Sequence, residues 1–188
     1  MDISAAIVSH NRRKGLLNTI YQLENQIVPF KEIKLYVSGY EDGELSDLEK
    51  KYKISYERDL KDWGHDKRAK AVQECTTKYI LCASDDDVYT YHFTEAVYKY
   101  ILSEPLGQVY ATDWRTQREF HTDSYGYHIA EPRLGGVTSG CMVLDAEFIR
   151  NNNCYTYRDF GADGRMCTDI VSKGGKFVRV PYTCFFHY

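Results

Sequence analysis

The sequence of 188 residues contains no long hydrophobic run and no excess of basic residues. Because no segment approaches the roughly 20 apolar residues that a membrane-spanning helix needs, we expect no membrane span. The first residues include neither a basic region nor an apolar segment, so no signal peptide is expected and a cytoplasmic location is favoured. The net charge of −3 excludes a global positive field that would attract nucleic acid or anionic membranes.

Paired cysteines are also lacking. The six cysteines are scattered and form no Cys-x-x-Cys pair, so a structural zinc site is not expected. Several of them fall inside predicted strands or helices, as small buried hydrophobic residues do. The sequence therefore predicts reduced thiols, which agrees with a cytosolic protein.

The chain has the size of one globular domain and no internal division. It contains no repeat, low-complexity tract or linker, so we expect a single domain over residues 1–188. Within residues 1–90, the pattern predicts strands at 3–9, 32–38, 54–57 and 78–84, and helices at 16–26, 45–52 and 66–75. This alternation is typical of an α/β fold with a mostly parallel central sheet flanked by helices, the α/β/α sandwich.

The second half of the chain has a different character. Its pattern predicts helices at 92–102, 146–151 and 163–172, and strands at 108–113, 137–144 and 176–180. The segment 119–129 alternates many aromatic residues around Gly126, which predicts a hairpin or an ordered loop.

Three consecutive aspartates, Asp85, Asp86 and Asp87, follow the predicted strand at 78–84. Like charges this close repel one another, and a divalent cation such as Mg²⁺ or Mn²⁺ would relieve the repulsion. Ligands of open α/β sheets bind beyond the carboxyl ends of the strands, where these residues lie. The alternative is a helix N-cap with an acidic first turn. One aspartate would satisfy that alternative, so three favour a metal–phosphate site.

Several segments, in order along the chain, resemble the motifs of family 2-like glycosyltransferases. They are Ala6–Arg12, the helix with Leu17, Ile20, Leu23 and Asn25-Gln26, the segment Gly64–Ala71, the Asp-x-Asp-like Ser84–Asp87, Gly161–Asp163, Gly174–Phe177, and Val180-Pro181. The resemblance spans nearly the whole chain. It implies the Rossmann-like GT-A fold, in a compact form of the kind found in large viruses and phages, which would place the protein in the host cytoplasm.

The chain departs from the family pattern in a few places. Ala162 stands where the family has the Glu of Glu-Asp, and Arg68-Ala69-Lys70 replaces Ala-Arg-Asn. Residues 38–42 replace Asp-x-Ser-x-Asp, and the Gln-x-x-Arg-Trp element is absent. These differences concern contacts to the nucleobase and the acceptor more than the fold.

The resemblance implies a metal-dependent inverting glycosyltransferase that uses a nucleotide sugar, with a UDP-sugar favoured. Residues 1–90 would bind the donor and residues 91–188 the acceptor, with acceptor specificity in loops such as 116–136. A glycan or glycoprotein is the expected acceptor, because no basic stripe for nucleic acid is visible. A modified base of viral or phage DNA remains an alternative acceptor.

Transfer requires a cation to stabilise the leaving diphosphate and a base to take the acceptor proton. The resemblance implies Asp87 as the main ligand of Mn²⁺ or Mg²⁺, with Asp85 directed toward the ribose or a metal-bound water. Asp86 would contact the cofactor or turn inward as a cap. His187 is a further candidate ligand, since imidazole suits Mn²⁺, although it could instead pack between Phe186 and Tyr188.

Asp163 takes the position of the catalytic base by the same resemblance. It is also predicted to open a helix, where an N-cap role would explain it equally well. Asp169 is its main rival as the base, and Asp159 is a weaker one.

Residues expected to contact the nucleotide or its diphosphate gather mainly near the ends of predicted strands. They are Ser9, His10, Arg12, Asp42, Lys67, Arg68, Asp85 and Asp86. Arg12 could instead be a surface cation, and Lys67 and Arg68 could lie on a solvated helix face. Trp114 could stack on an acceptor ring or pack within a loop.

Two other functions fit parts of the pattern. A nucleotidyltransferase also uses carboxylate-bound Mg²⁺ on an α/β sheet, but it should carry a Gly-rich basic loop after the first strand, of which residues 10–15 are a poor version. A catalytically inactive binding module would have lost the aspartates or the base, and this chain retains candidates for both.

Overall fold

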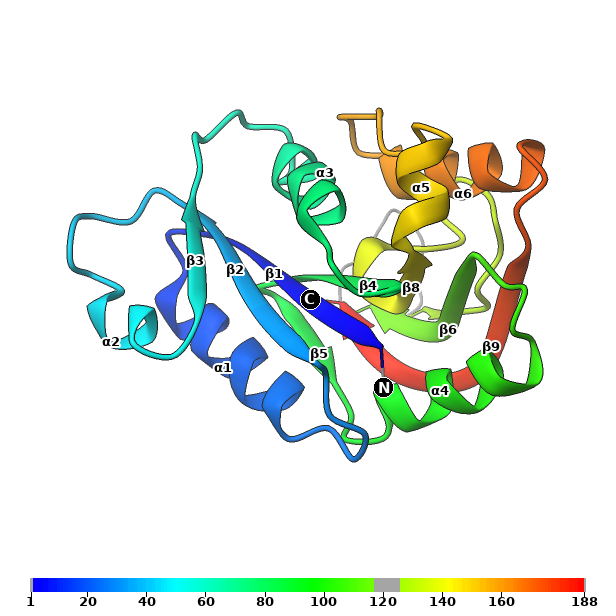
Figure 1. The fold of residues 1–188 in the computed structure, drawn as a ribbon, viewed down its shortest axis with the longest axis horizontal. Coiled ribbons are helices and arrows are strands. Elements are labelled where there is room, and N and C mark those ends of the chain that lie inside the picture. The colour runs from blue at the N-terminus through cyan, green and yellow to red at the C-terminus, as the bar shows by residue number, and fades with distance from the viewer. Residues whose placement is uncertain (1, 117–125, 188) are drawn as a thin grey trace.

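One curled, nine-stranded sheet runs through the computed structural model, which describes residues 2–116 and 126–187 (Figure 1). The strands are β1 (Ile3–His10), β2 (Glu32–Ser38), β3 (Lys53–Tyr56), β4 (Tyr79–Ser84), β5 (Asp87–Tyr89), β6 (Val109–Thr116), β7 (Tyr127–His128), β8 (Met142–Asp145) and β9 (Phe177–His187). Their order is β3-β2-β1-β4-β8-β6-β9-β5, with β7 also paired to β6.

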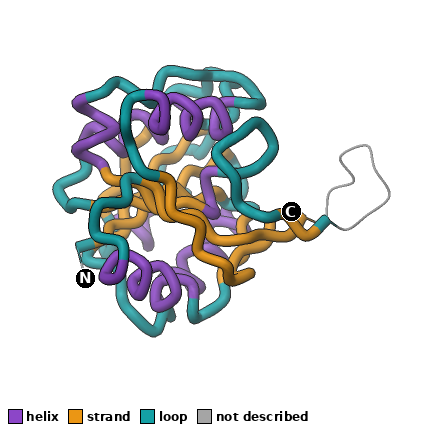
Figure 2. The backbone as a smooth tube through the Cα atoms, turned by 90° about the vertical axis from the view of Figure 1, so that its right-hand side faces the viewer, coloured by secondary structure: helices purple, strands orange, loops and turns teal. Residues whose placement is uncertain are grey.

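Helices cover both faces of this sheet (Figure 2). They are α1 (Arg13–Glu24), α2 (Ser46–Glu49), α3 (His65–Glu74), α4 (Phe93–Ser103), α5 (Ala146–Asn151) and α6 (Ala162–Ser172). A short 3₁₀ helix, η1, spans Ser139–Cys141. The α/β class and the layered arrangement predicted from the sequence are thereby confirmed.

The first half of the sheet is parallel. Strand β1 pairs in parallel with β2 and β4, and β2 pairs in parallel with β3. Seven of the eight residues of β1 are buried, as expected for a strand that is covered on both faces. Leu16, Ile20 and Leu23 of α1, and Ala71 and Val72 of α3, are buried with it in the core. This half therefore follows the predicted β-α-β pattern.

The second half of the sheet is mixed. Strand β8 is antiparallel to β4 and β6, whereas β9 is parallel to β6 and antiparallel to β5. The strand predicted at 137–144 forms a strand only from Met142 onward, as part of β8, because η1 precedes it. Most of the predicted hairpin at 119–129 lies outside the described residues, and its described end, β7, pairs with β6.

Strand β9 continues well beyond the strand predicted at 176–180. Its register against β6 shifts between Thr112 and Asp113, so that Val180 and Thr183 face consecutive residues of β6. Pro181 and Tyr182 lie between Val180 and Thr183 and have no partner residue in β6. Proline cannot donate a backbone hydrogen bond, and at this position none is required. The extension brings the end of β9 beside β5, and it pairs Asp87 with His187.

The six cysteines are free and buried, as the sequence predicts. None of the helices in residues 2–116 and 126–187 is long and apolar enough to cross a membrane.

Candidate functional site

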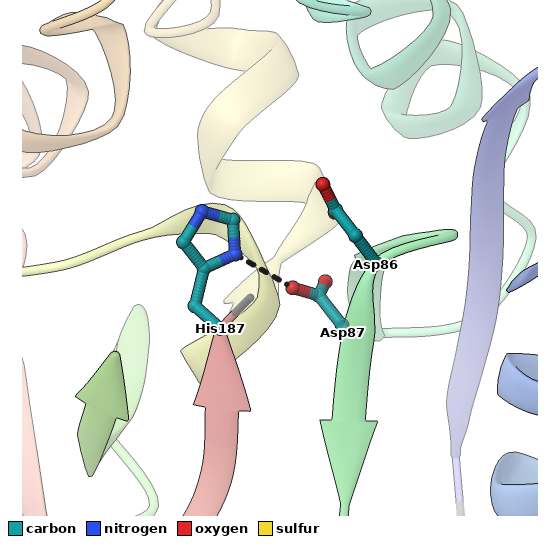
Figure 3. Close-up of side chains that lie close together, drawn as sticks. All are labelled: Asp86, Asp87 and His187. Carbon is teal, nitrogen blue, oxygen red and sulfur yellow. Dashed lines mark hydrogen bonds and ion pairs between the residues drawn. The ribbon is translucent and has the colours of Figure 1, made fainter. Parts of the chain in front are cut away.

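Two carboxylates and one imidazole converge where β4 ends and β5 pairs with β9. Figure 3 shows Asp86, Asp87 and His187, which each offer a ligand atom within 4.8 Å of the others. His187 Nδ1 is hydrogen-bonded to Asp87 Oδ1 at 3.1 Å. The other oxygen of Asp87 accepts a hydrogen bond from the backbone N of Ser84 at 2.7 Å. His187 follows Asp87 by 100 residues in the sequence, and the pairing of β5 with β9 places the two side by side.

The chemistry of this cluster suits a divalent cation. Asp87 is only 2% exposed, and burial raises the pKa of its carboxyl, an effect that the hydrogen bond from His187 opposes. A buried carboxylate that retains its charge needs a positive partner. Carboxylate oxygens with an imidazole are ligands that Mn²⁺ accepts, and the residues present therefore fit such an ion.

Asp85 is not part of this cluster. Its Oδ2 accepts hydrogen bonds from Ser9 Oγ at 2.8 Å and from the backbone N of His10 at 3.2 Å. Burial raises the pKa of Asp85, and the hydrogen bond from Ser9 and the Arg12 charge oppose that rise. The sequence predicts Asp85 as a ligand and Asp86 at the cofactor or turned inward as a cap; in the structure it is Asp86 that lies with Asp87 and His187.

Arg12 connects the two neighbouring aspartates. Its Nη1 lies 2.9 Å from Asp86 Oδ2 and 3.3 Å from Asp85 Oδ1, and its side chain is half exposed. The backbone N of Arg12 donates to the Tyr40 hydroxyl, which also bonds to Ser9 Oγ. These contacts join the end of β1 to the aspartate run, and an exposed guanidinium there can meet a phosphate.

An open pocket of about 550 Å³ lies beside this network. It is lined by Asn11, Gly39, Glu41, Asp42 and Glu44. Gly39 has a φ of +72°, and a side chain on it would collide with the His10 ring. The pocket lined by Asp42 lies at the carboxyl ends of β1 and β2. Nucleotides bind at this place in open α/β sheets.

Helix α3 carries two buried cations, and one of them, Arg68, reaches the same end of the sheet. Lys67 and Arg68 are 5% and 7% exposed, so the alternative of a solvated helix face is wrong. Arg68 donates to Ser84 Oγ and to the carbonyl of Trp63, both at 2.6 Å. Burial lowers the pKa of Arg68, but surrounding acidic groups, which include Asp163 and Asp87, raise it above its ordinary value.

Asp163 lies in the first turn of α6, but Gly161 occupies the N-cap position, so the N-cap alternative is wrong. Its Oδ2 accepts a hydrogen bond from the backbone N of Ser139 at 2.9 Å. Its Oδ1 is buried and has no hydrogen-bond partner among the described residues. The rivals Asp159 and Asp169 form ion pairs with Arg165 and Lys173.

The turn η1 links this candidate base to the candidate metal ligands. Ser139 contacts Asp163, and a side chain on the next residue, Gly140, would collide with Asp87 Oδ2 and the Phe185 ring. One short turn therefore sets the positions of both carboxylates. No motif in the sequence marks it, because its role depends on contacts with β5, β9 and α6.

Trp114 packs rather than presenting its face to solvent. It is 6% exposed, stacks on His128 with a centroid distance of 3.9 Å, and meets the edge of His187 at 6.5 Å. Its Nε1 donates to the carbonyl of Gly136. Of the two interpretations of Trp114, the structure confirms packing, although Trp114 packs within strand β6 and not in a loop.

His65 is a buried histidine, affected by the charges of Arg68 and Asp163, whose environment the sequence does not reveal. It is 3% exposed, and its Nδ1 has no hydrogen-bond partner among the described residues. Burial, together with the Arg68 charge, lowers the pKa of His65 to about 4, although Asp163 opposes the shift. The sequence shows only that His65 follows Gly64 near the start of a predicted helix, which does not indicate that its imidazole is buried.

Comparisons with known proteins agree with this geometry. The sequence profile of the family described as Glycosyl transferase family 2 matches residues 4–163. The structure is similar to that of S. aureus TarS 1-349, with a TM-score of 0.76, 14% identity, and coverage of 100% of this chain and 60% of that one. It is also similar to TarS 1-349 in complex with UDP, with a TM-score of 0.73, 13% identity, and coverage of 99% and 60%.

A third similar structure is TarS 1-349 in complex with UDP-GlcNAc, with a TM-score of 0.76, 14% identity, and coverage of 99% and 58%. At this identity the likeness shows the fold alone, and the chain spans less than two thirds of the length of each. No curated protein matches the chain in sequence.

Proposed function

Since the chain belongs to glycosyl transferase family 2 and is a glycosyltransferase, we propose that it moves a sugar from a UDP-sugar to a hydroxyl of a glycan acceptor. The transfer inverts the configuration of the anomeric carbon and requires a divalent cation. Residues 1–90 supply most of the donor site and residues 91–188 most of the acceptor site. The family assignment removes the nucleotidyltransferase alternative. A cytoplasmic location accompanies this proposal, supported by the six free cysteines.

The observation that carries the proposal is the cluster of Asp86, Asp87 and His187 at the carboxyl end of β4. These residues would hold the cation, which when bound stabilises the negative charge on the leaving diphosphate. Arg12 and Arg68 lie at the same end of the sheet and would meet the phosphates. The pocket beside Asp42 would receive the nucleoside, and the UDP and UDP-GlcNAc complexes of TarS support a uridine donor.

Asp163 would act as the base. Its Oδ2 is held by the Ser139 backbone N, which leaves Oδ1 to accept the proton of the acceptor hydroxyl as it attacks. A carboxylate with one oxygen fixed and the other buried without a hydrogen-bond partner in the described part of the chain would take that proton once the acceptor hydroxyl reaches it.

A panel of nucleotide sugars tests the proposal. The protein is incubated with UDP-, GDP-, CMP- and dTDP-sugars, with Mn²⁺, Mg²⁺ or EDTA, and release of the nucleotide is measured. We expect release from a UDP-sugar that requires the cation, and calorimetry should show cation-dependent binding of the same compound. Binding and release that are equal in EDTA would contradict the metal assignment, and the absence of binding to any nucleotide sugar would contradict the proposed function.

A further inference from the structure

Two large aromatic side chains lie exposed at the end of the molecule that carries the candidate site. Trp63 is 65% exposed and Phe160 is 69% exposed, and their rings meet edge to face with centroids 6.1 Å apart. Trp63 precedes α3, and Phe160 ends the loop between α5 and α6; both loops lie at the top of Figure 1. One ring therefore comes from each half of the chain.

The backbone is shaped to present the indole outward. Lys61 and Trp63 have positive φ angles of 51° and 59°, which residues other than glycine rarely adopt. The side chain of Asp62 accepts hydrogen bonds from the backbone N atoms of Gly64 and Asp66, and Arg68 donates to the carbonyl of Trp63. The position of Trp63 is thus fixed by its neighbours rather than left to a free loop.

The pair is connected to the residues assigned to catalysis. Arg68, which holds the carbonyl of Trp63, also donates to Ser84 beside the aspartate run. Phe160 lies three residues before Asp163. An ion pair between Arg158 and Asp66 joins the loop before α6 to the first turn of α3. Both rings therefore lie on segments that carry or contact the residues assigned to catalysis, and a group seated on the rings would be held by those segments.

The charges around the rings favour a neutral occupant. Residues 58–66 and 158–165 carry five carboxylates, Asp59, Asp62, Asp66, Asp159 and Asp163, and four cations, Arg58, Lys61, Arg158 and Arg165. Two of the cations already pair with Asp66 and Asp159. A surface so balanced offers little to a chain of phosphates, whereas aromatic faces with a rim of polar groups suit the apolar face and the hydroxyls of a sugar ring.

We propose that Trp63 and Phe160 form a subsite that stacks against a neutral sugar ring of the acceptor, next to Asp163. This deepens and rests on the proposed function, because it names the class of acceptor at the same site. The pair sets how the acceptor is held, and it takes no part in the binding of the nucleotide or the cation.

The first test measures binding of the full chain to an array of neutral, sulfated and phosphorylated oligosaccharides, with a dT₂₀ oligonucleotide beside them. We expect binding to at least one neutral glycan. Trp63→Ala and Phe160→Ala should each weaken it by roughly tenfold, as expected for the loss of one stacking ring. Tyr182→Ala is the matched control, because Tyr182 and Tyr100 form another partly exposed edge-to-face pair, between β9 and α4.

The second measurement separates the subsite from the donor site. Binding of the UDP-sugar with Mn²⁺, followed by calorimetry, should be unchanged in Trp63→Ala and Phe160→Ala, and it also reports that the variants are folded. Absence of binding to every neutral glycan, preference for dT₂₀ or phosphorylated glycans, or full binding by both variants would overturn the subsite. Failure of the proposed function differs from these results, since wild-type protein would then bind no nucleotide sugar.

Discussion

At the scale of single residues, the structure distinguishes three neighbouring aspartates that the sequence presents as a run. Asp86 and Asp87 lie with His187, whereas Asp85 fastens the end of β1. The resemblance implies Asp87 as the main ligand, with Asp85 directed toward the ribose or a metal-bound water. The chain turns at Asp85 and Asp86, between β4 and β5, so the alternation that would place Asp85 and Asp87 on one side of an extended strand does not apply.

The first prediction concerns the metal ligands. Asp87→Asn and Asp86→Asn should each raise the Mn²⁺ concentration required for donor binding, with the larger effect at the buried Asp87, because each removes an anionic ligand. Calorimetric titration with Mn²⁺ in the presence of UDP measures this effect. Asp47→Asn, at an exposed aspartate paired with Arg13, serves as the control. Unchanged Mn²⁺ affinity in Asp87→Asn would show that the cluster is not the metal site.

The second prediction concerns the base. Asp163→Asn keeps an oxygen for the hydrogen bond from Ser139 but removes basicity, so transfer should fall by about 10²–10⁴-fold while UDP-sugar binding persists. The comparison of turnover with donor affinity by calorimetry checks this. Asp169→Asn, at the main rival, should retain turnover. The opposite pattern would move the assignment to Asp169.

The third prediction follows from the pKa of His65. Its pKa in the folded protein is about 4, against about 6.5 when unfolded, so the unfolded chain binds more protons between these values. Its neutral form therefore contributes stability that is complete above pH 6.5 and is lost as pH falls toward 4, by up to about 3 kcal/mol. Urea unfolding at pH 7 and pH 4.5 should show a smaller difference for His65→Gln than for wild type. His92→Gln, at an exposed histidine, should show the same difference in unfolding free energy between the two pH values as wild type. If His65→Gln also shows the wild-type difference, the buried imidazole of His65 is not the cause of the loss of stability at low pH.

At the scale of secondary-structure elements, η1 is the connection that motif analysis could not supply. Its three residues touch both Asp163 and the surroundings of Asp87. The sequence predicts a strand over the same residues, within 137–144. The role of η1 comes from its contacts with β9 and α6. These contacts are tertiary, so the local sequence of η1 does not reveal them.

The fourth prediction tests this turn. Gly140→Ala would place a methyl group against Asp87 Oδ2 and the Phe185 ring, so we expect a loss of roughly 1–3 kcal/mol in stability together with weaker Mn²⁺ binding. Urea unfolding and Mn²⁺ titration measure the two effects. Ser139→Ala is the control, because the hydrogen bond to Asp163 comes from its backbone N. Equal behaviour of Gly140→Ala and wild type would show that the turn yields without cost to the site.

At the scale of the whole molecule, the parallel half of the sheet could be predicted because its signals are local. Apolar runs such as residues 3–9 and 78–84 are bounded by turns, and α1 has helical periodicity. The site could be predicted only in part. Asp87 and His187 were identifiable as candidates, but their pairing depends on a strand that continues past Pro181, and local propensity argues against such a strand.

The last prediction follows from this long-range pairing. The proposed cation site joins β5, in the first half of the chain, to the end of β9, in the second. A ligand that binds only the folded form stabilises it, by about 2.7 kcal/mol at a hundred times its dissociation constant. Mn²⁺ and UDP together should therefore raise the Tm of the whole protein and protect β9 from proteolysis.

His187→Ala should lose most of that rise in Tm and the protection of β9, because it removes the ligand that β9 contributes. Thermal scans and limited proteolysis, each with and without Mn²⁺ and UDP, measure the two effects. His92→Gln, which changes an exposed histidine on the surface, should respond to the ligands as wild type does. If His187 only packs against Phe185 and Trp114, His187→Ala should have a lower Tm than wild type but the same rise in Tm on addition of Mn²⁺ and UDP. In that case β9 would have no part in holding the cation.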